Sequence, residues 1–201
     1  MPIPVLDGVR LDVQQLQSRF GARVLGAFER NQETYVLVAR ESIAEVAQFL
    51  KESPDLAYDY FSECLGVDYS AWPHARDVPE RFEVVYNLMS TKHYSRLFLK
   101  VGVDDGQSVP TLKYVYLGAE YPEKEVADLF GIRFAGNELV GERFLLPDDW
   151  VGYPLRKEFP LGGEDVPFDA ATIGPAVEDL AMPHAGESFD GRTGSEDVSG
   201  R

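Results

Sequence analysis

The sequence contains a single cysteine among its 201 residues, Cys64. A disulfide within the chain is therefore impossible, and so is a zinc or iron–sulfur site that needs four cysteine thiolates. The three histidines, His74, His93 and His184, do not show the spacing of metal ligands, either to one another or to Cys64. We therefore expect no metal site on this chain, and we expect Cys64 to be a small buried apolar residue.

Long apolar runs and nucleotide-binding motifs are also missing. No stretch approaches the ~18–20 apolar residues that are needed to span a bilayer. The N-terminus lacks the basic start and the apolar run of a secretory signal. There is no Walker A loop, no GxGxxG motif after a strand and no GxSxG motif. We expect any membrane association to be indirect, through a partner protein.

Positive charge is scarce. Nineteen Lys and Arg residues stand against 34 Asp and Glu, which gives a formal net charge of −15 and a pI near 4.5. Nucleic acids are bound by clustered Lys and Arg, so no nucleic-acid partner is expected, and an anionic membrane surface is disfavoured. Residues 164–201 hold nine of the acidic residues and two of the basic ones. Gly, Pro and Ser are frequent there, so this acidic tail is predicted to be largely disordered.

Hydrophobic periodicity predicts an α+β fold for the first two thirds of the chain. The pair Ser42 and Glu45 matches a capping box at the start of the second helix. Residues 57–69 fit neither period clearly. Because short turns join most of the strands, we expect a mostly antiparallel sheet with helices packed on one face. The predicted helices are 11–20, 42–52 and the segment after Pro122, and the predicted strands are 24–28, 34–39, 82–89, 95–103 and 112–117.

The chain is predicted to have three parts. Residues 1–135 form the α+β core domain, and residues 164–201 form the acidic tail. Between them, residues 136–163 form an extended segment rich in Pro and Gly, which we call the strap. Its large apolar side chains are costly to leave in water, so the strap either covers its own domain or docks into a partner. The sequence leaves both alternatives open.

Carboxylates are abundant, but no recognisable catalytic set is present. Asp104-Asp105 is typical of a turn, and Asp148-Asp149 is typical of a loop. The helix after Pro122 places Val126, Leu129 and Phe130 on one apolar stripe. Its carboxylates lie off that stripe, and those of the first turn suit the positive helix end. Composition alone therefore indicates a surface helix, and no catalytic residue is assigned.

Two motifs, EKEVADLFGI and PLRKEFPL, resemble the C-type subunit of the proton-pumping NADH:quinone oxidoreductase, the 30 kDa subunit family of respiratory complex I. The resemblance covers roughly residues 35–163, and residues 65–69 and 81–86 share it. Lys124 stands where the family usually has Arg, Tyr153 stands where it has His, and Arg143 is displaced by two residues. The matching residues are Glu123, Glu125, Asp128, Leu129, Phe130, Gly131 and Ile132, and then Gly152, Tyr153, Pro154, Leu155, Arg156, Lys157, Glu158, Phe159, Pro160 and Leu161.

The resemblance implies a scaffold subunit of the hydrophilic arm that binds no cofactor itself. FMN, the iron–sulfur clusters and quinone would be held by other subunits, and the complex would pass electrons from NADH to quinone and translocate protons. The implied partners are the B-, D- and I-type subunits, on the cytoplasmic side of the bacterial inner membrane. The implied interface and motif residues are Glu123, Glu125, Asp128, Phe130, Gly131, Tyr153, Pro154, Leu155, Arg156, Lys157, Phe159 and Pro160.

Arg156 is of special interest among them, because a guanidinium can bind a partner carboxylate in a bidentate fork. Arg156→Glu is therefore expected to lower the amount of assembled complex. Three alternatives stay open. The chain could be the equivalent subunit of a membrane-bound hydrogenase or of a ferredoxin-dependent NDH-type complex. It could be a soluble hydrolase that uses Glu125 or Asp128, or an adaptor unrelated to respiration.

Overall fold

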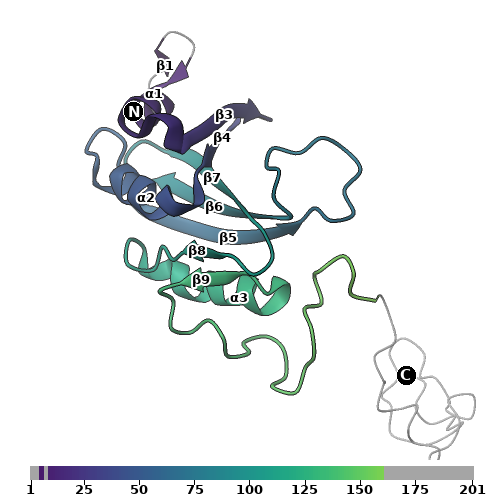
Figure 1. The fold of residues 1–201 in the computed structure, drawn as a ribbon. Helices are drawn as coiled ribbons and strands as arrows, with labels where there is room; N and C mark the ends of the chain where they lie inside the picture. Colours follow the sequence, from purple (N-terminus) through teal and green to yellow (C-terminus); the bar gives the residue numbers. More distant parts are fainter. Residues whose placement is uncertain (1–4, 7–8, 161–201) are drawn as a thin grey trace, which may run out of the picture. The chain divides into compact units, whose positions relative to one another are not determined.

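The computed structural model describes residues 5–6 and 9–160, so the predictions for Leu161 to Gly163 and for the acidic tail lie outside the described residues. Three α-helices and one central sheet form the framework of the described chain (Figure 1). The elements, in chain order, are β1 (Val5–Leu6), β2 (Val9–Arg10), α1 (Leu11–Phe20), β3 (Val24–Arg30), β4 (Glu33–Val38), α2 (Ile43–Glu52), β5 (Tyr60–Asp68), β6 (Phe82–Ser90), β7 (Ser95–Val103), β8 (Ser108–Pro110), α3 (Glu120–Phe130) and β9 (Arg133–Ala135).

The central sheet has five strands in the order β3-β4-β7-β6-β5. The pairs β3/β4, β7/β6 and β6/β5 are antiparallel, and β4/β7 is parallel. The predicted α+β class is therefore confirmed, with a sheet that is mixed rather than purely antiparallel. Two further small sheets pair β1 with β2 and β8 with β9.

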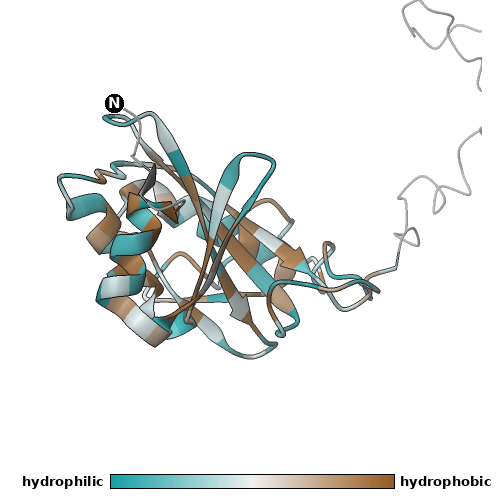
Figure 2. Ribbon diagram, turned by 90° about the horizontal axis from the view of Figure 1, so that it is seen from above, coloured by the Kyte–Doolittle hydropathy of each residue, from teal (hydrophilic) through white to brown (hydrophobic). Residues whose placement is uncertain are grey.

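One face of the central sheet carries the core. Strands β6 and β7 alternate as predicted, and Val84 lies opposite Val101 while Tyr86 lies opposite Leu99, all of them fully buried. All three α-helices add side chains to this core, as expected for helices on one face. Phe130 of α3 packs so closely on β5 that a Cβ at Gly66 would lie 2.8 Å from its ring. Figure 2 shows the hydrophobic stretches along the strands.

Strands β3 and β4 form an antiparallel hairpin. Asn31 and Gln32 both have positive φ, 54° and 67°, which are the values of the two-residue turn that matches strand twist. The ambiguous segment 57–69 contains β5, the edge strand of the sheet. Helix α3 starts before Pro122, at Glu120. Pro122 then lies in the first turn, where its missing N–H has no helical partner to lose.

Two local predictions are wrong. Ser42 ends a 3-10 turn over Arg40–Ser42 and has helical backbone angles, so its hydroxyl makes no capping hydrogen bond; a cap residue needs extended angles. Glu45 pairs with Arg23 instead, at 2.6 Å. Residues 112–117 form turns rather than a strand. The carbonyl of Leu112 accepts hydrogen bonds from the N–H groups of both residues 115 and 116.

The described part of the strap, residues 136–160, contains turns and one isolated bridge, without a helix or a strand. It runs along α3 and ends near the turn that follows β7, so its contacts involve both the helix and the sheet. These contacts contain most of the residues on which the family resemblance depends.

Candidate functional site

Glu123 fastens the first half of α3 to its surroundings. Its side chain is fully buried and accepts four hydrogen bonds. The donors are the N–H of Leu112 (2.7 Å), the hydroxyl of Thr111 (2.5 Å), the side-chain amide of Asn137 (3.0 Å) and the hydroxyl of Tyr86 (3.3 Å). Burial raises the pKa of Glu123, and these donors offset the increase only in part. The carboxylate joins helix, sheet and the start of the strap.

Asp128 holds the middle of the strap. One of its oxygens accepts the consecutive N–H groups of Phe144 (3.1 Å), Leu145 (2.8 Å) and Leu146 (3.1 Å). The other oxygen accepts a hydrogen bond from Arg143 at 3.1 Å. Burial works to raise the pKa of Asp128, but these donors outweigh it and hold the pKa below its ordinary value. Asp128 is therefore ionised and fixes the backbone path of the strap.

Arg143 continues this network toward the end of the strap. Its guanidinium donates to the carbonyls of Trp150 (2.8 Å) and Gly152 (3.2 Å), in addition to Asp128. Its guanidinium carbon also lies 5.6 Å from the centre of the Tyr153 ring. The displacement of Arg143 in the sequence therefore does not prevent it from bracing the loop of which it is part.

Arg156 binds its own domain. It donates to the carbonyl of Phe130 at 2.7 Å, and its two terminal nitrogens bind the two oxygens of Asp105, each at 3.0 Å. Tyr153 lies under the same guanidinium, 4.7 Å from ring centre to carbon. Gly131, with φ +73°, makes room for both side chains, because a Cβ there would lie 2.5 Å from the Tyr153 ring. The bidentate pair of donors on Arg156, which was expected to bind a partner carboxylate, therefore binds Asp105 of the same chain.

The end of the strap is attached to the sheet through Asp68, at the end of β5. The buried carboxylate of Asp68 accepts the N–H of Lys157 at 3.0 Å and two hydrogen bonds from Arg81, at 3.0 and 3.3 Å. Arg81 also pairs with Glu158. Burial works to raise the pKa of Asp68, and the donors overcome it and lower the pKa well below its ordinary value. Asp68 and Arg81, which are paired with each other, therefore hold the strap at residues 157 and 158.

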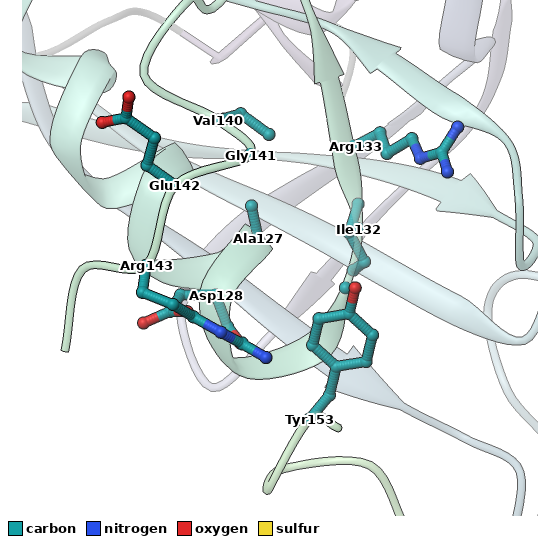
Figure 3. A pocket seen from close by; sticks show the side chains of 10 residues that line it. Ala127, Asp128, Ile132, Arg133, Val140, Gly141, Glu142, Arg143 and Tyr153 are labelled. Carbon is teal, nitrogen blue, oxygen red and sulfur yellow. The ribbon is translucent and has the colours of Figure 1, made fainter. Parts of the chain in front are cut away.

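A pocket of about 310 Å³ lies between α3, β9 and the strap (Figure 3). Ala127, Ile132 and Val140 give it an apolar lining, and Arg143 and Tyr153 border it. In the described part of the chain, no group of three or more His, Cys, Asp or Glu side chains is placed to hold a metal ion. Asp128 and Arg143 fasten the strap, and the side chains of Arg133 and Glu142 point away from the pocket (Figure 3).

The other predicted residues lie on the outer side of the strap and helix. Leu155 is half exposed, and its N–H donates to the carbonyl of Leu129 at 3.2 Å. Phe159 stacks on Trp150, with 6.0 Å between the ring centres. Contacts of these residues with another subunit stay a prediction. Pro154 is half buried, and Glu125, Lys157 and Pro160 are exposed.

The interpretation of α3 as a surface helix is wrong for Glu123 and Asp128, which are both buried, and holds for Glu125. Sequence reasoning missed Asp68, Arg81 and Asp105, which bind the last part of the strap, residues 156–158. Asp68 and Arg81 fall in the two short stretches that share the family resemblance, which is the signal that could have identified them. For Asp105, the sequence indicates only that the residue lies in a turn. Among the described residues, no helix has both the length and the apolar character to cross a bilayer.

Comparison with known proteins identifies the family of the chain. The family model described as the 30 kDa subunit of respiratory-chain NADH dehydrogenase matches residues 36–165. The C-type subunit of NADH-quinone oxidoreductase from Roseiflexus sp. strain RS-1 is 43% identical over 157 residues, which are 78% of this chain and 86% of that protein. The C-type subunit from Geobacter sulfurreducens is 42% identical over 154 residues, which are 76% and 90% of the two chains.

Two solved structures share the fold. A trypsin-resistant fragment of Nqo5 has a TM-score of 0.55 and 28% identity, and the match covers 63% of this chain and 98% of the fragment. A chain of a membrane-bound sulfane sulfur reductase, an archaeal respiratory membrane complex, has a TM-score of 0.60 and 26% identity, with 74% and 84% covered. The chain therefore belongs to the 30 kDa subunit family of respiratory-chain NADH dehydrogenase, the family of the C-type subunit of NADH-quinone oxidoreductase.

Proposed function

We propose that this chain is a structural subunit of a proton-translocating NADH:quinone oxidoreductase and supports its assembly around the quinone-site subunits. The observation that carries this proposal is the use of the family motif residues. Glu123, Asp128 and Arg156 each bind backbone groups of their own chain, so their hydrogen-bonding capacity serves the strap. Residues engaged in this way position a segment and do not act as an acid, a base or a ligand.

The proposed subunit binds no cofactor of its own. One cysteine cannot hold a cluster that needs four thiolates, and burial raises the pKa of the Cys64 thiol well above its ordinary value, which disfavours the thiolate. FMN, iron–sulfur clusters and quinone then belong to other subunits. The proposed partners are the B-, D- and I-type subunits, on the cytoplasmic side of the bacterial inner membrane.

A second candidate is the equivalent subunit of a related respiratory membrane complex. The fold similarity to a chain of the sulfane sulfur reductase complex supports it, with a TM-score above that of the Nqo5 fragment. Membrane-bound hydrogenases and ferredoxin-dependent NDH-type complexes are in the same group of alternatives. The higher identity to the subunits of NADH-quinone oxidoreductase, 43% against 26%, favours the first proposal.

The test is purification of the tagged chain from gently solubilised native membranes, followed by identification of its partners and an NADH:quinone assay. We expect co-elution with iron–sulfur and quinone-site subunits and an activity that quinone-site inhibitors block. Co-elution with hydrogenase or ferredoxin-dependent subunits would support the second candidate. A chain that elutes alone would refute both. Activity of that isolated chain, lost in Asp128→Asn or Glu125→Gln, would indicate the hydrolase, and unrelated partners would indicate an adaptor.

A further inference from the structure

Among the described residues, Lys124 is a cation without a paired anion. The residue is 8% exposed, and within the described part of the chain no ion pair or hydrogen bond involves its ammonium group. The carboxylates one helical turn away, at positions i−4 and i+4, are Glu120 and Asp128. Glu120 pairs with Lys113 at 2.9 Å, and Asp128 is taken by Arg143 and the strap. The helix therefore offers Lys124 no free partner.

Exposed apolar side chains surround this cation. The ammonium of Lys124 lies 5.5 Å from the centre of the Phe144 ring, and the Tyr121 ring lies 5.7 Å from the same ring. Tyr121 is 57% exposed, Phe144 41% and Leu145 56%. We call Tyr121, Lys124, Phe144 and Leu145 the α3–strap surface. Exposed aromatic and aliphatic residues around a nearly buried cation are typical of a binding surface.

The α3–strap surface is also held in place. The N–H groups of Phe144 and Leu145 donate to the carboxylate of Asp128, while their side chains point away from the core and stay accessible. A surface fixed in this way loses little conformational freedom when a partner binds. The geometry therefore suits docking of a preformed face.

Charge determines what kind of partner fits. The side chain of Lys124 is largely buried, and among the described residues its ammonium meets only a ring face, so a partner carboxylate that arrives with apolar neighbours would bind it in surroundings with little water. Glu125, the exposed neighbour of Lys124, repels additional negative charge at the rim. A single acidic side chain flanked by apolar residues therefore fits better than a polyacidic stretch such as residues 164–201 of this chain.

We propose that the α3–strap surface docks a segment of a partner protein in which one Asp or Glu, flanked by apolar side chains, binds Lys124. This inference rests on the proposed function as a subunit, and it specifies the contact. The partner carboxylate accepts a hydrogen bond from the ammonium of Lys124, which donates to no group in the described part of its own chain. Tyr121 and Phe144 are covered by the apolar residues on either side of that carboxylate.

The first experiment places a photo-reactive benzophenone amino acid at position 121 of the full chain, in cells that assemble the complex. The control carries it at Tyr94, which is 84% exposed in the turn between β6 and β7. We expect position 121 to cross-link to another subunit, in a peptide with one acidic residue among apolar ones, and position 94 not to yield that peptide. A cross-link to a second copy of this chain or to its own residues 161–201 would overturn the proposal, as would no cross-link in an intact complex.

The second experiment compares Lys124→Gln with Lys124→Arg. Loss of one member of a desolvated charge pair weakens binding strongly. We therefore expect the purified complex to retain at least about tenfold less of the Gln variant than of the wild type, and a near-normal amount of the Arg variant. The melting temperature of the isolated chain should not fall for Lys124→Gln, since no internal ion pair is lost. If the wild type co-elutes with the respiratory subunits and the Gln variant does so equally well, only the docking surface is refuted. A wild-type chain that elutes without any respiratory subunit refutes the proposed function, and the docking surface with it.

Discussion

Replacement of Asp128 by Asn tests whether this carboxylate holds the strap on the domain. The Asn oxygen can still accept the three N–H groups of residues 144–146, but its NH₂ group then faces the guanidinium of Arg143, a donor against a donor. Hydrogen bonds to a charged group contribute about 1.5–3 kcal/mol each, and the Arg143 bond is lost outright. We therefore expect opening of the strap to become easier by about 2 kcal/mol.

Hydrogen exchange measures this opening directly. Because about 1.4 kcal/mol corresponds to a tenfold change, the N–H groups of residues 144–146 should exchange about 10–100-fold faster in Asp128→Asn, while the amides of β6 and β7 keep their protection. Glu125→Gln is the matched control, because Glu125 is an exposed acidic residue on the same helix. Unchanged exchange at residues 144–146, or an equal loss of protection in β6 and β7, would refute the assigned role of Asp128.

The same carboxylate gives the anchor a defined dependence on pH. The pKa of Asp128 is lower in the folded protein than its unfolded value of about 3.9. Its stabilisation is therefore fully present above about pH 4 and is lost as the pH falls through the folded pKa. The protection of the amides of residues 144–146 in the wild type, corrected for the intrinsic effect of pH on exchange, should thus fall in that acidic range, and the Asn variant should lack this step.

Three further predictions test the same assembly, with chemical denaturation as the measurement. Gly131→Ala should destabilise the chain by about 1–3 kcal/mol, and by more than Gly106→Ala, since both glycines have positive φ but only a Cβ at Gly131 meets other atoms; equal losses would remove the close-approach argument. Burial raises the pKa of Glu123 above its unfolded value of about 4.3, so its contribution favours folding below about pH 4 and is lost as the pH rises through the folded pKa. Glu123→Gln should abolish this pH dependence, and a Gln variant that keeps it would show that another group is responsible. Because Asp105 is half exposed, a double-mutant cycle of Arg156→Gln and Asp105→Asn should give a coupling of at most about 1 kcal/mol. A larger coupling would mean that this pair is less screened by water than its exposure indicates.

The strands were predictable where a local pattern determines them. Val84 and Tyr86 on β6, and Leu99 and Val101 on β7, alternate with residues of the opposite face, and this period is visible in the sequence alone. The pairing of β4 with β7 was not predictable, because α2, β5 and β6 lie between them in the chain and no local pattern records which strands become neighbours.

The failure at residues 112–117 has a similar physical cause. Leu112 and Tyr116 are both buried, which alternation interprets as one face of a strand, but a spacing of four residues also brings side chains together in a helical turn. A distant contact decides between them. The hydroxyl of Tyr116 donates to the carbonyl of Tyr58 at 2.7 Å, and the turn places it there.

The candidate site could be located from the sequence but not understood from it. The motif residues were identified through the resemblance, yet the burial of Glu123 and Asp128 depends on donors that lie 11 to 37 residues away. Lys157 binds Asp68 across 89 residues of sequence. Acidic residues in a helix suggest solvent exposure unless their donors are known, and the donors here come from β6, from the residues after β8 and from the strap.

The hydrogen bonds of Asp128 have a consequence for variation in the strap. Asp128 binds the N–H groups of residues 144–146 and none of their side chains, so any residue except proline can supply the same three donors. The helix thereby sets the course of the main chain and leaves the side chains at these positions free to change. Relatives that bind different partner subunits can then change the side chains of the α3–strap surface one residue at a time, while the backbone beneath them stays the same.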